Sequence, residues 1–370
     1  MRNPNEQVRE LLEACVHDHG EVGVQTAAYL DGKLAVDTWA GLADESTQRP
    51  VDGNTLFTAF SISKGITATC IHILAGRGLL DYEAPIARYW PEFGIRGKSE
   101  TTIRHALTHQ AGIPKDPPEM DIRMMCDWEA VTRATAELEV QSNPGTRIDY
   151  HALTFGWILG EIVRRVDGRP ISVFLQEEIV TPLNITDLYF GIPKSKEHLV
   201  ATLVNEPDLE EHKRDFNIAD SHPLSDTAVT FNRSDVRSAS IPGAGAITNA
   251  RSLARFYAML AAGGELDGVR ILSEDGLSRA LVPVPEDNKT ADMRWWSRHC
   301  LGYTLGGGPG PRESRPGAFG YEGTGTIAFA DPDRKFAFVF LKNMVDLSPI
   351  DENSSVTRVC QAVENALGID

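Results

Sequence analysis

The sequence predicts an α/β (α+β) fold, with an antiparallel sheet built from N- and C-terminal strands, flanked by helices, plus a mostly helical lobe. Two observations predict it: alternating β-patterns occur near both ends, and helical periodicity fills the chain between them. Because the two sets of strands can share one sheet only if the chain folds back, the sheet domain should be discontinuous. We expect 1–65 and 240–370 to form it, 66–239 to form the helical domain, and the active site to lie between them.

The first elements are a helix and a hairpin. The start, MRNPNEQVRELLEACVHDHG, places its apolar residues from Val8 to Cys15 on one helix face and lacks the continuous apolar core of a signal peptide. The next segment, VGVQTAAYLDGKLAVDTWAG, carries two alternating runs around Asp31-Gly32, a turn pair that hairpins prefer. Sheet structure is therefore expected early in the chain.

Helical periodicity dominates the middle of the chain, and β-patterns return near its end. The segment GYEGTGTIAFADPDRKFAFVFLKN predicts a second hairpin with Asp331-Pro332-Asp333 as its turn, followed by a helix over 353–367. A Gly/Pro-rich loop, 306–317, directly precedes this hairpin. The helices expected before it span 62–80, 101–108, 128–139, 152–166, 171–178 and 251–262.

Composition argues against several classes of protein. The chain of 370 residues has a formal charge of -16 and no Lys/Arg cluster, so nucleic-acid binding is not expected. The longest apolar run, Ile66 to Ala75, carries a histidine and is about half the length of a membrane span. Five scattered cysteines without paired spacing predict reduced thiols in a cytoplasmic protein, with neither a disulfide framework nor a zinc site.

The stretch FSISKG places Lys64 one helical turn after Ser61, at the start of an apolar helix. Residues three apart share one side of a helix, so the two side chains can meet. Since this helix is apolar on nearly every side, it should lie centrally, with Lys64 beside or inside the core. Burial disfavours an ammonium, and a neutral amine could activate Ser61 as a nucleophile near the helix N-terminus, where an oxyanion is stabilised.

The Ser-x-x-Lys spacing also has a plainer interpretation. At ordinary serine and lysine frequencies, the pattern occurs by chance about once in a chain of this length. Ser61 could simply cap the helix, and Lys64 could extend its amine to water. The wider sequence context favours the nucleophile.

Several ordered segments together carry a family resemblance. They are FSISKG at the helix start, LLDYEAPIARYWPEFG (79–94), TIRHALTHQAGIP (102–114), PGTRIDYHALTFGWILGEIVRRVDGRP (144–170) and GAGAITNARSLARFYAML (243–260). From about residue 20 to its end, the chain resembles the serine β-lactamase and penicillin-binding-protein superfamily. It is most similar to the class C-like branch that contains the family VIII carboxylesterases. The resemblance implies a β-lactamase/transpeptidase-like fold.

The second motif of that superfamily, Tyr-x-Asn, corresponds to Tyr150-His151-Ala152, in which only the tyrosine is kept. The resemblance implies that Tyr150 meets Ser61 and Lys64 and shares proton transfer with the lysine. Either Lys64 is neutral and Tyr150 passes a proton to the leaving group, or the Lys64 ammonium stabilises a Tyr150 phenolate. Because the two titrations are coupled, both schemes stay open.

The third motif, Lys-Thr-Gly, is often His-x-Gly or Trp-x-Gly in the esterase branch and corresponds here to Tyr321-Glu322-Gly323. By that alignment, the backbone N–H groups of Ser61 and Thr324 form the oxyanion hole. Gly323 would let the strand approach closely. The plainer interpretation is an ordinary strand with an aromatic side chain facing the core.

The departures from the family motifs predict the substrate class. In the family, the third-motif lysine helps to bind the carboxylate of penicillins, and the second-motif asparagine contacts their amide. Here Ala152 offers no hydrogen bond, Tyr321 no positive charge, and Glu322 would add a negative charge if it points inward. Lactam recognition should therefore be poor. An uncharged ester needs only a nucleophile, a base, an oxyanion hole and an apolar acyl slot.

An apolar slot is expected from residues after Ile113, although each of its candidates could equally belong to the core. His105 and His109 stand i,i+4 on an expected helix but lack the glutamate of the zinc-protease signature, so no metal site is expected. The expected substrate-binding residues are Tyr321, Glu322, Gly323, Ala152, His151, Met124, Trp128 and Trp295, with Met120, Met125 and Trp296 as further slot candidates.

The sequence thus predicts a cofactor-free carboxylesterase that acts through an acyl-enzyme on small, short-chain uncharged esters. Ser61 is the expected nucleophile, and Lys64 and Tyr150 the expected proton-transfer groups. A β-lactamase or D-amino peptidase, an acyltransferase, and a non-catalytic receptor on the same scaffold remain alternatives. The expected partner is a small-molecule ester, and a homo-oligomer is possible from sequence.

Overall fold

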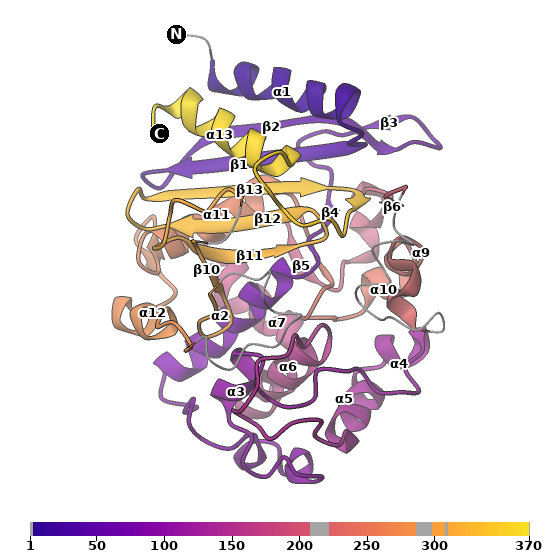
Figure 1. Cartoon of the computed structure of the whole chain (residues 1–370), viewed down its shortest axis with the longest axis vertical. Coiled ribbons are helices and arrows are strands. Elements are labelled where there is room, and N and C mark those ends of the chain that lie inside the picture. Colours follow the sequence, from indigo (N-terminus) through magenta and orange to yellow (C-terminus); the bar gives the residue numbers. More distant parts are fainter. Residues whose placement is uncertain (1–2, 208–221, 286–297, 308–309, 370) are drawn as a thin grey trace.

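The computed structural model describes residues 3–207, 222–285, 298–307 and 310–369. Its centre is a seven-stranded sheet in which strands from both ends of the chain are neighbours (Figure 1). The α+β prediction, with an antiparallel sheet of terminal strands, is confirmed. The strand order is β10 (Thr304–Leu305), β11 (Phe319–Gly323), β12 (Thr326–Asp331), β13 (Phe336–Lys342), β1 (Gly23–Leu30), β2 (Lys33–Asp44) and β3 (Arg49–Pro50).

The early hairpin is present, and the late one is part of a three-stranded meander. Asp31 and Gly32 join β1 to β2 with φ values of 49° and 73°, as a turn matching the strand twist requires. Near the end, the expected hairpin with its turn at Asp331-Pro332-Asp333 is confirmed as β12 and β13. Thr324 and Gly325, with φ values of 49° and 76°, form a further turn, so β11 is a strand of its own beside β12.

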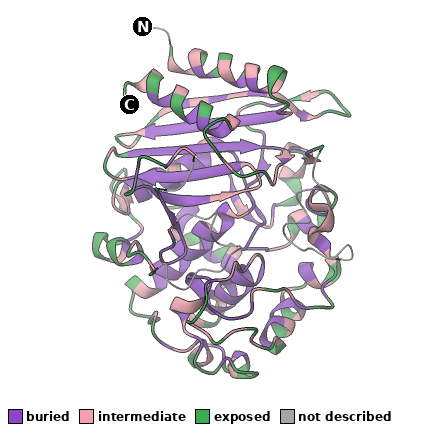
Figure 2. Ribbon diagram, viewed as in Figure 1, coloured by how far each residue is buried: buried purple, intermediate pink, exposed green. Residues whose placement is uncertain are grey.

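Both faces of the sheet are covered, as the alternation along β13 shows. Phe336, Phe338 and Phe340 pack under α1 (Pro4–Asp18) and α13 (Ser355–Leu367). The alternate residues Ala337, Val339 and Leu341 belong to the larger core on the other face, beneath α11 (Ala250–Ala261). Because successive strand residues point to opposite faces, a sheet covered twice needs an unbroken apolar strand. Figure 2 shows these strands buried along most of their length.

The helix that carries the Ser-x-x-Lys pattern lies at the centre of the fold, as predicted. Every residue of α2 (Ile62–Gly76) from Ile62 to Leu74 is buried. The helix ends at Gly76 and not at Leu80, because Gly78 adopts a φ of 71° and Leu79 N–H bonds back to Leu74 O. This is a glycine C-terminal cap.

The remaining helices form the lobe beneath the sheet and its margins (Figure 1). The helix expected over 101–108 is shorter, and the one expected over 171–178 continues as a π-helical turn over Gln176–Val180. The other helices are α3 (Ile103–Leu107), α4 (Ile122–Cys126), α5 (Trp128–Glu137), α6 (Thr154–Asp167), α7 (Ile171–Leu175), α9 (Thr227–Phe231), α10 (Ser234–Ser238) and α12 (Glu274–Ala280), with 3-10 turns at Ile86–Arg88, Pro91–Gly94, Lys194–Leu199 and Pro223–Asp226.

Short strands complete the architecture. A three-stranded sheet in the order β4-β7-β5 lies where the chain enters α2, so it fixes the start of that helix. These strands are β4 (Phe57–Thr58), β7 (Ala246–Thr248) and β5 (Leu188–Phe190), and the two remaining pairs are β6 (Val204–Asn205) with β14 (Met344–Val345) and β8 (Glu265–Leu266) with β9 (Val269–Arg270). The division into domains at 65/66 and 239/240 stays a prediction.

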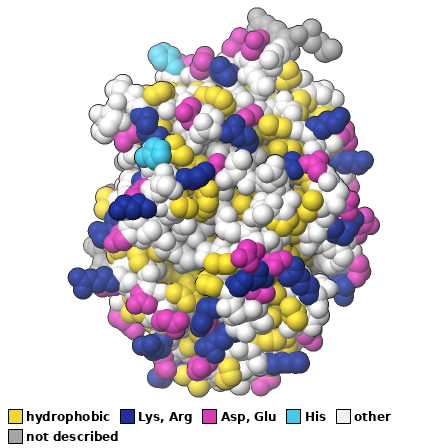
Figure 3. All heavy atoms as spheres, turned by 180° about the vertical axis from the view of Figure 1, so that it is seen from behind, with side chains coloured by type: hydrophobic (Ala, Val, Ile, Leu, Met, Phe, Trp, Pro, Cys, Tyr) yellow, Lys and Arg dark blue, Asp and Glu magenta, His cyan; other side chains and the backbone are white. Residues whose placement is uncertain are grey.

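On the face seen in Figure 3, acidic and basic side chains are interspersed and do not gather by sign. All five cysteines are free thiols, and four of them are buried. In the part of the chain that the structure describes, no helix combines the length and apolar character that a membrane crossing needs.

Candidate active site

Ser61 and Lys64 meet at the start of α2, where the preceding strand β4 delivers the chain. Ser61 is the N-cap residue of the helix and is partly exposed. Lys64 Nζ lies 3.1 Å from Ser61 Oγ and donates to Gly243 O at 2.8 Å. Phe60, directly before Ser61, has a φ of 45°, a strained conformation for an aromatic residue. The serine is therefore held at a sharp turn, with the amine against its oxygen.

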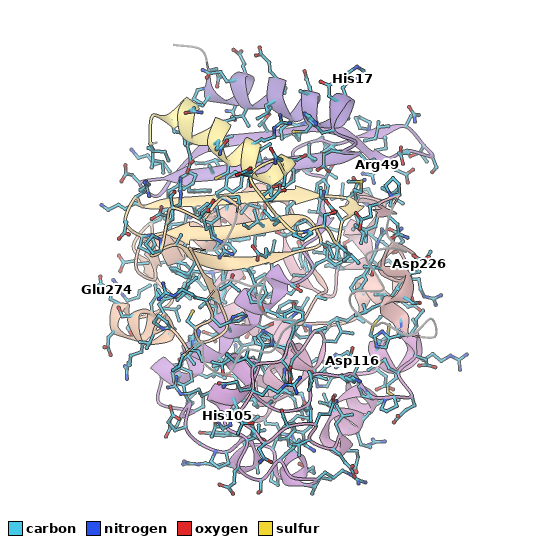
Figure 4. The ribbon with its side chains drawn as sticks, in the orientation of Figure 1. His17, Arg49, His105, Asp116, Asp226 and Glu274 are labelled. Carbon is cyan, nitrogen blue, oxygen red and sulfur yellow. The ribbon has the colours of Figure 1, made fainter. Side chains whose placement is uncertain are left out.

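Burial sets the protonation of Lys64. The residue has 0% exposure, and desolvation lowers its pKa from 10.5 to about 7. The Asp116 carboxylate opposes this shift and raises the pKa, but it lies in the lobe of helices with its own partner, His222, 3.3 Å away (Figure 4). Close to the amine lies an uncharged aromatic ring, since Nζ is 4.7 Å from the Tyr150 ring centroid. An amine in this setting can be neutral near pH 7.

Tyr150 completes a three-residue constellation. Its hydroxyl lies 2.6 Å from Ser61 Oγ, and the residue is partly exposed. Burial of the hydroxyl raises its pKa, hydrogen bonds with Ser61 and Tyr321 lower it, and the nearby Glu322 charge raises it further. Since burial dominates, the phenol holds its proton at neutral pH and can give it to a group that becomes more basic.

The backbone at the end of β11 approaches the serine closely. A Cβ at Gly323 would meet Ser61 Cβ at 2.8 Å and Ser61 N at 2.9 Å, so β11 touches the serine only because residue 323 is glycine. Among the described residues, neither the Ser61 N–H nor the Thr324 N–H has a hydrogen-bond acceptor. Thr324 follows with a φ of 49°, which is strained for a β-branched residue. Amides without partners next to a nucleophile are what an oxyanion hole requires.

This arrangement can be compared with known proteins. A family model described as Beta-lactamase matches residues 8–354. The chain belongs to the β-lactamase family. Its relative esterase/β-lactamase LipL of Mycobacterium tuberculosis (strain ATCC 25618 / H37Rv) is 33% identical over 350 residues, which covers 89% of this chain and 78% of LipL.

Solved structures of the β-lactamase family agree with this assignment. The chain matches a family VIII carboxylesterase with a TM-score of 0.86 at 31% identity, over 99% of this chain and 98% of the other. A penicillin-binding protein homolog from Caulobacter crescentus matches with a TM-score of 0.84, also at 31% identity and with 99% and 98% covered. The fold is therefore β-lactamase/transpeptidase-like, and the chain is a member of the esterase/β-lactamase superfamily of serine hydrolases.

The residues expected to form the third motif, Tyr321 to Gly323, lie on β11. Tyr321 has 1% exposure, and its hydroxyl lies 2.9 Å from His109 Nε2. Glu322 is 21% exposed and pairs with the buried guanidinium of Arg312, at 3.1 Å between Oε2 and Nη2. The expectation of an uncompensated inward anion is therefore wrong, because Arg312 neutralises that carboxylate.

The second-motif neighbours of Tyr150 have structural roles. His151 is buried, its Nδ1–H donates to Asp149 O at 2.6 Å, and its Nε2 accepts from Ile113 N–H at 3.2 Å. Both ring nitrogens are thus occupied by the backbone, which contradicts a substrate-binding role for His151. Ala152 is partly exposed, and its carbonyl oxygen would lie 2.9 Å from a Cβ at Gly243.

The expected slot residues fall into three groups. Met120 and Met125 are buried in a cluster with Phe60, and Met124 and Trp128 pack against that cluster while partly exposed. Trp128 also donates its indole N–H to Glu161 Oε2 at 2.9 Å. This apolar cluster therefore reaches the residue next to the serine. Trp295 and Trp296 lie outside the described residues.

The histidine pair does not share a helix face. α3 ends at Leu107, and His109 has a φ of 59°, so the expectation that both histidines stand on one helix is wrong. His105 Nδ1 accepts from the backbone of Thr102 and closes a capping box. Within the described residues, no three His, Cys, Asp or Glu side chains gather as a metal site would require.

Sequence reasoning missed three residues that shape the site, Gly243, Asp116 and Arg312, and one contact, that of His109 with Tyr321. Gly243 lies in the GAGAIT segment that carries the family resemblance, which could have marked it. The other contacts join residues at least 10 positions apart, beyond the spacing that a helix or strand period relates, so no local pattern identifies them.

Proposed function

We propose that this chain is a carboxylesterase that hydrolyses small, short-chain uncharged esters through an acyl-enzyme on Ser61. The observation that carries the proposal is the fully buried Lys64 amine, 3.1 Å from Ser61 Oγ, with the Tyr150 hydroxyl 2.6 Å from the same oxygen. A nucleophile, a base and a second proton-transfer group thus meet at one atom.

In the proposed acylation, Ser61 Oγ attacks the ester carbonyl and gives its proton to the neutral Lys64 amine. The carbonyl oxygen becomes an oxyanion held by the Ser61 and Thr324 N–H groups. When the intermediate collapses, the C–O bond to the alcohol breaks and Tyr150 gives its proton to the leaving oxygen. Tyr150 then regains a proton from the Lys64 ammonium, which restores both groups.

In the proposed deacylation, a water molecule takes the place of the departed alcohol. Its proton passes to the same Lys64 and Tyr150 pair, and its oxygen attacks the acyl carbon. The acid leaves, and Ser61 recovers its proton. Every proton is returned, so the cycle needs neither a cofactor nor a metal.

The preference for uncharged esters rests on the groups around the site. A substrate carboxylate would need an available cation, but Tyr321 occupies the third-motif position and Glu322 already engages the Arg312 guanidinium. The apolar cluster beside Phe60 instead offers a surface for a short acyl chain.

A panel of p-nitrophenyl esters of graded acyl length tests the proposal. We expect turnover to be highest for short acyl chains, and intact-mass analysis to detect an acyl group on Ser61. Ser61→Ala should abolish both signals and keep the fold, because it removes one oxygen. Turnover that survives Ser61→Ala would mean that the active site lies elsewhere. If no activated ester acylates the protein, the result would favour a non-catalytic receptor.

A β-lactamase is the second candidate, since the relative LipL carries both activities in its name. A chromogenic cephalosporin assayed beside p-nitrophenyl acetate separates the esterase from the β-lactamase. Faster turnover of the cephalosporin would make the β-lactamase the preferred function. Added alcohols distinguish an acyltransferase, because new ester products would then appear by mass spectrometry.

A further inference from the structure

A hydrogen-bonded chain of side chains runs from the protein interior to Tyr150. The backbone N–H of His151 donates to His109 Nδ1 at 3.1 Å, so that nitrogen carries no proton. A neutral His109 therefore holds its proton on Nε2, which lies 2.9 Å from the Tyr321 oxygen. That oxygen accepts from His109, so the Tyr321 hydroxyl proton is available for the hydrogen bond that Tyr321 shares with Tyr150. The two tyrosine rings lie on the same amine, with Lys64 Nζ at 4.7 Å from the Tyr150 centroid and 5.9 Å from the Tyr321 centroid.

The surroundings keep this chain neutral. His109 has 1% exposure, and its ring packs between Tyr150 at 4.9 Å and Phe155 at 5.1 Å between centroids. Burial lowers its pKa well below the ordinary value, and the charges of His299, His151 and Lys64 act in the same direction. Glu322 is the carboxylate that faces Tyr150 and Tyr321, and Arg312 compensates it.

His109 is also held in one orientation. Its backbone φ of 59° is unusual for a residue with a Cβ, and His299 stacks edge-on at 5.7 Å between ring centroids. Such strain persists only where the surrounding structure fixes it. Neither His109 nor the Tyr321 hydroxyl takes part in the proposed acylation or deacylation.

We propose that His109 and Tyr321 form a neutral hydrogen-bond relay that stabilises the negative charge on the Tyr150 oxygen while it gives its proton to the leaving alcohol. This inference rests on the proposed esterase function and adds two positioning residues to it. A donor already aimed at the developing charge needs no reorganisation during the reaction. The relay therefore matters most for alcohols that are poor leaving groups.

Two esters with the same acyl group test the relay: p-nitrophenyl acetate, whose leaving group departs without a proton, and ethyl acetate, whose leaving group needs one. Tyr321→Phe and His109→Leu should lower kcat/KM for ethyl acetate roughly tenfold or more, the effect of one hydrogen bond to a charged group. The loss for p-nitrophenyl acetate should be smaller. A structural role would lower both equally, and equal losses would overturn the relay.

Three further variants sharpen the test. His109→Gln keeps an N–H donor near the same position and should restore the ethyl acetate activity that His109→Leu loses. The Tyr321→Phe/His109→Leu double variant should lose no more than either single variant, because both break one chain; multiplied losses would contradict the relay. Tyr303→Phe is the matched control, since it removes a buried hydroxyl bonded to Thr69 at 2.7 Å on α2 and should not separate the two esters.

The relay can also be tested without measuring esterase activity. Nitrogen-15 NMR of His109 should show a neutral ring protonated on Nε2, whose resonance shifts in Tyr321→Phe. A His109 protonated on Nδ1 would overturn the relay even in an active esterase. If the wild-type protein hydrolyses neither ester, the proposed function fails, and this spectrum still decides whether the relay exists.

Discussion

The described residues include three buried lysines, Lys64, Lys98 and Lys342, and the first and the last of them have opposite surroundings. Lys64 contacts a hydroxyl and the Gly243 carbonyl, and its pKa falls to about 7. Lys342, at the end of β13, has 3% exposure and bonds to Glu21 at 3.1 Å and Asp346 at 2.8 Å. These two carboxylates outweigh burial and raise the pKa of Lys342.

The different surroundings of Lys64 and Lys342 show what makes a buried amine reactive. A lysine between carboxylates stays charged and holds structure together, whereas one that faces a hydroxyl, a carbonyl and aromatic rings becomes a base. The turn after β11 links Ser61 to the second lysine, since a Cβ at Gly323 would meet Ser61 and one at Gly325 would meet Lys342 Cε at 2.2 Å. The structural lysine thus supports the turn that carries the Thr324 amide.

Replacing each lysine by methionine should separate chemistry from stability most strongly. Lys64→Met removes the proposed base, so we expect kcat/KM for p-nitrophenyl acetate to fall roughly 10²–10⁴-fold. The free energy of unfolding should change by about 1 kcal/mol at most, because one hydrogen bond to Gly243 is lost. Ester kinetics and urea denaturation of the same preparation check both. Full activity in this variant would show that Lys64 is not the base.

Lys342→Met should have the reverse profile. It leaves Glu21 and Asp346 with no cation between them, and breaking a buried ion pair from one side lowers the free energy of unfolding by roughly 3–5 kcal/mol. Urea denaturation measures this loss. Activity per folded molecule should fall far less than in Lys64→Met, and an equal loss would mean that the two lysines do not differ in role.

Substitutions at the two glycines beside the turn, Gly323 and Gly325, should again separate activity from stability, with smaller effects than the lysine variants. Gly323→Ala drives a methyl group into Ser61, so it should lower kcat/KM roughly 10²-fold, as loss of an oxyanion donor does. Gly325→Ala, at a φ of 76° and against Lys342, should instead lower stability by about 1–3 kcal/mol. Gly76→Ala, with nothing within 4 Å, is the control and should change neither quantity appreciably.

The smallest effect is a pH dependence. The pKa of Lys64 is lowered to about 7, so the amine is charged below that pH and neutral above it. A neutral base implies that kcat/KM rises about tenfold between pH 6 and pH 8 and then levels. The opposite sign, with activity falling over that range, would assign Lys64 a role as an ammonium beside a Tyr150 phenolate.

Local patterns predicted the elements well but not their partners. The Asp31-Gly32 turn, the apolar α2 and the Ser61 and Lys64 spacing follow from periods and turn preferences within a few residues. The Thr324-Gly325 turn was missed, because a β-branched residue with positive φ is not a turn signal.

The site was predictable only as far as the family resemblance reached. The resemblance predicted that Tyr150 meets Ser61. These residues are 89 positions apart, and no spacing rule relates them. The pairing of Glu322 with Arg312, the backbone bonds of His151 and the contact of His109 with Tyr321 depend on side-chain packing across elements. Such contacts decide charge and orientation, and the sequence encodes them only through the whole fold.

Titration of the lysine side chains by carbon-13 NMR at Cε measures the protonation of Lys64, on which the proposed esterase function depends. The resonance that is absent from Lys64→Met should titrate with a midpoint near pH 7, and the one absent from Lys342→Met should stay in its charged position well beyond that pH. A Lys64 midpoint at the ordinary value of 10.5 would contradict the account, because the amine beside Ser61 would then be charged and unable to take its proton.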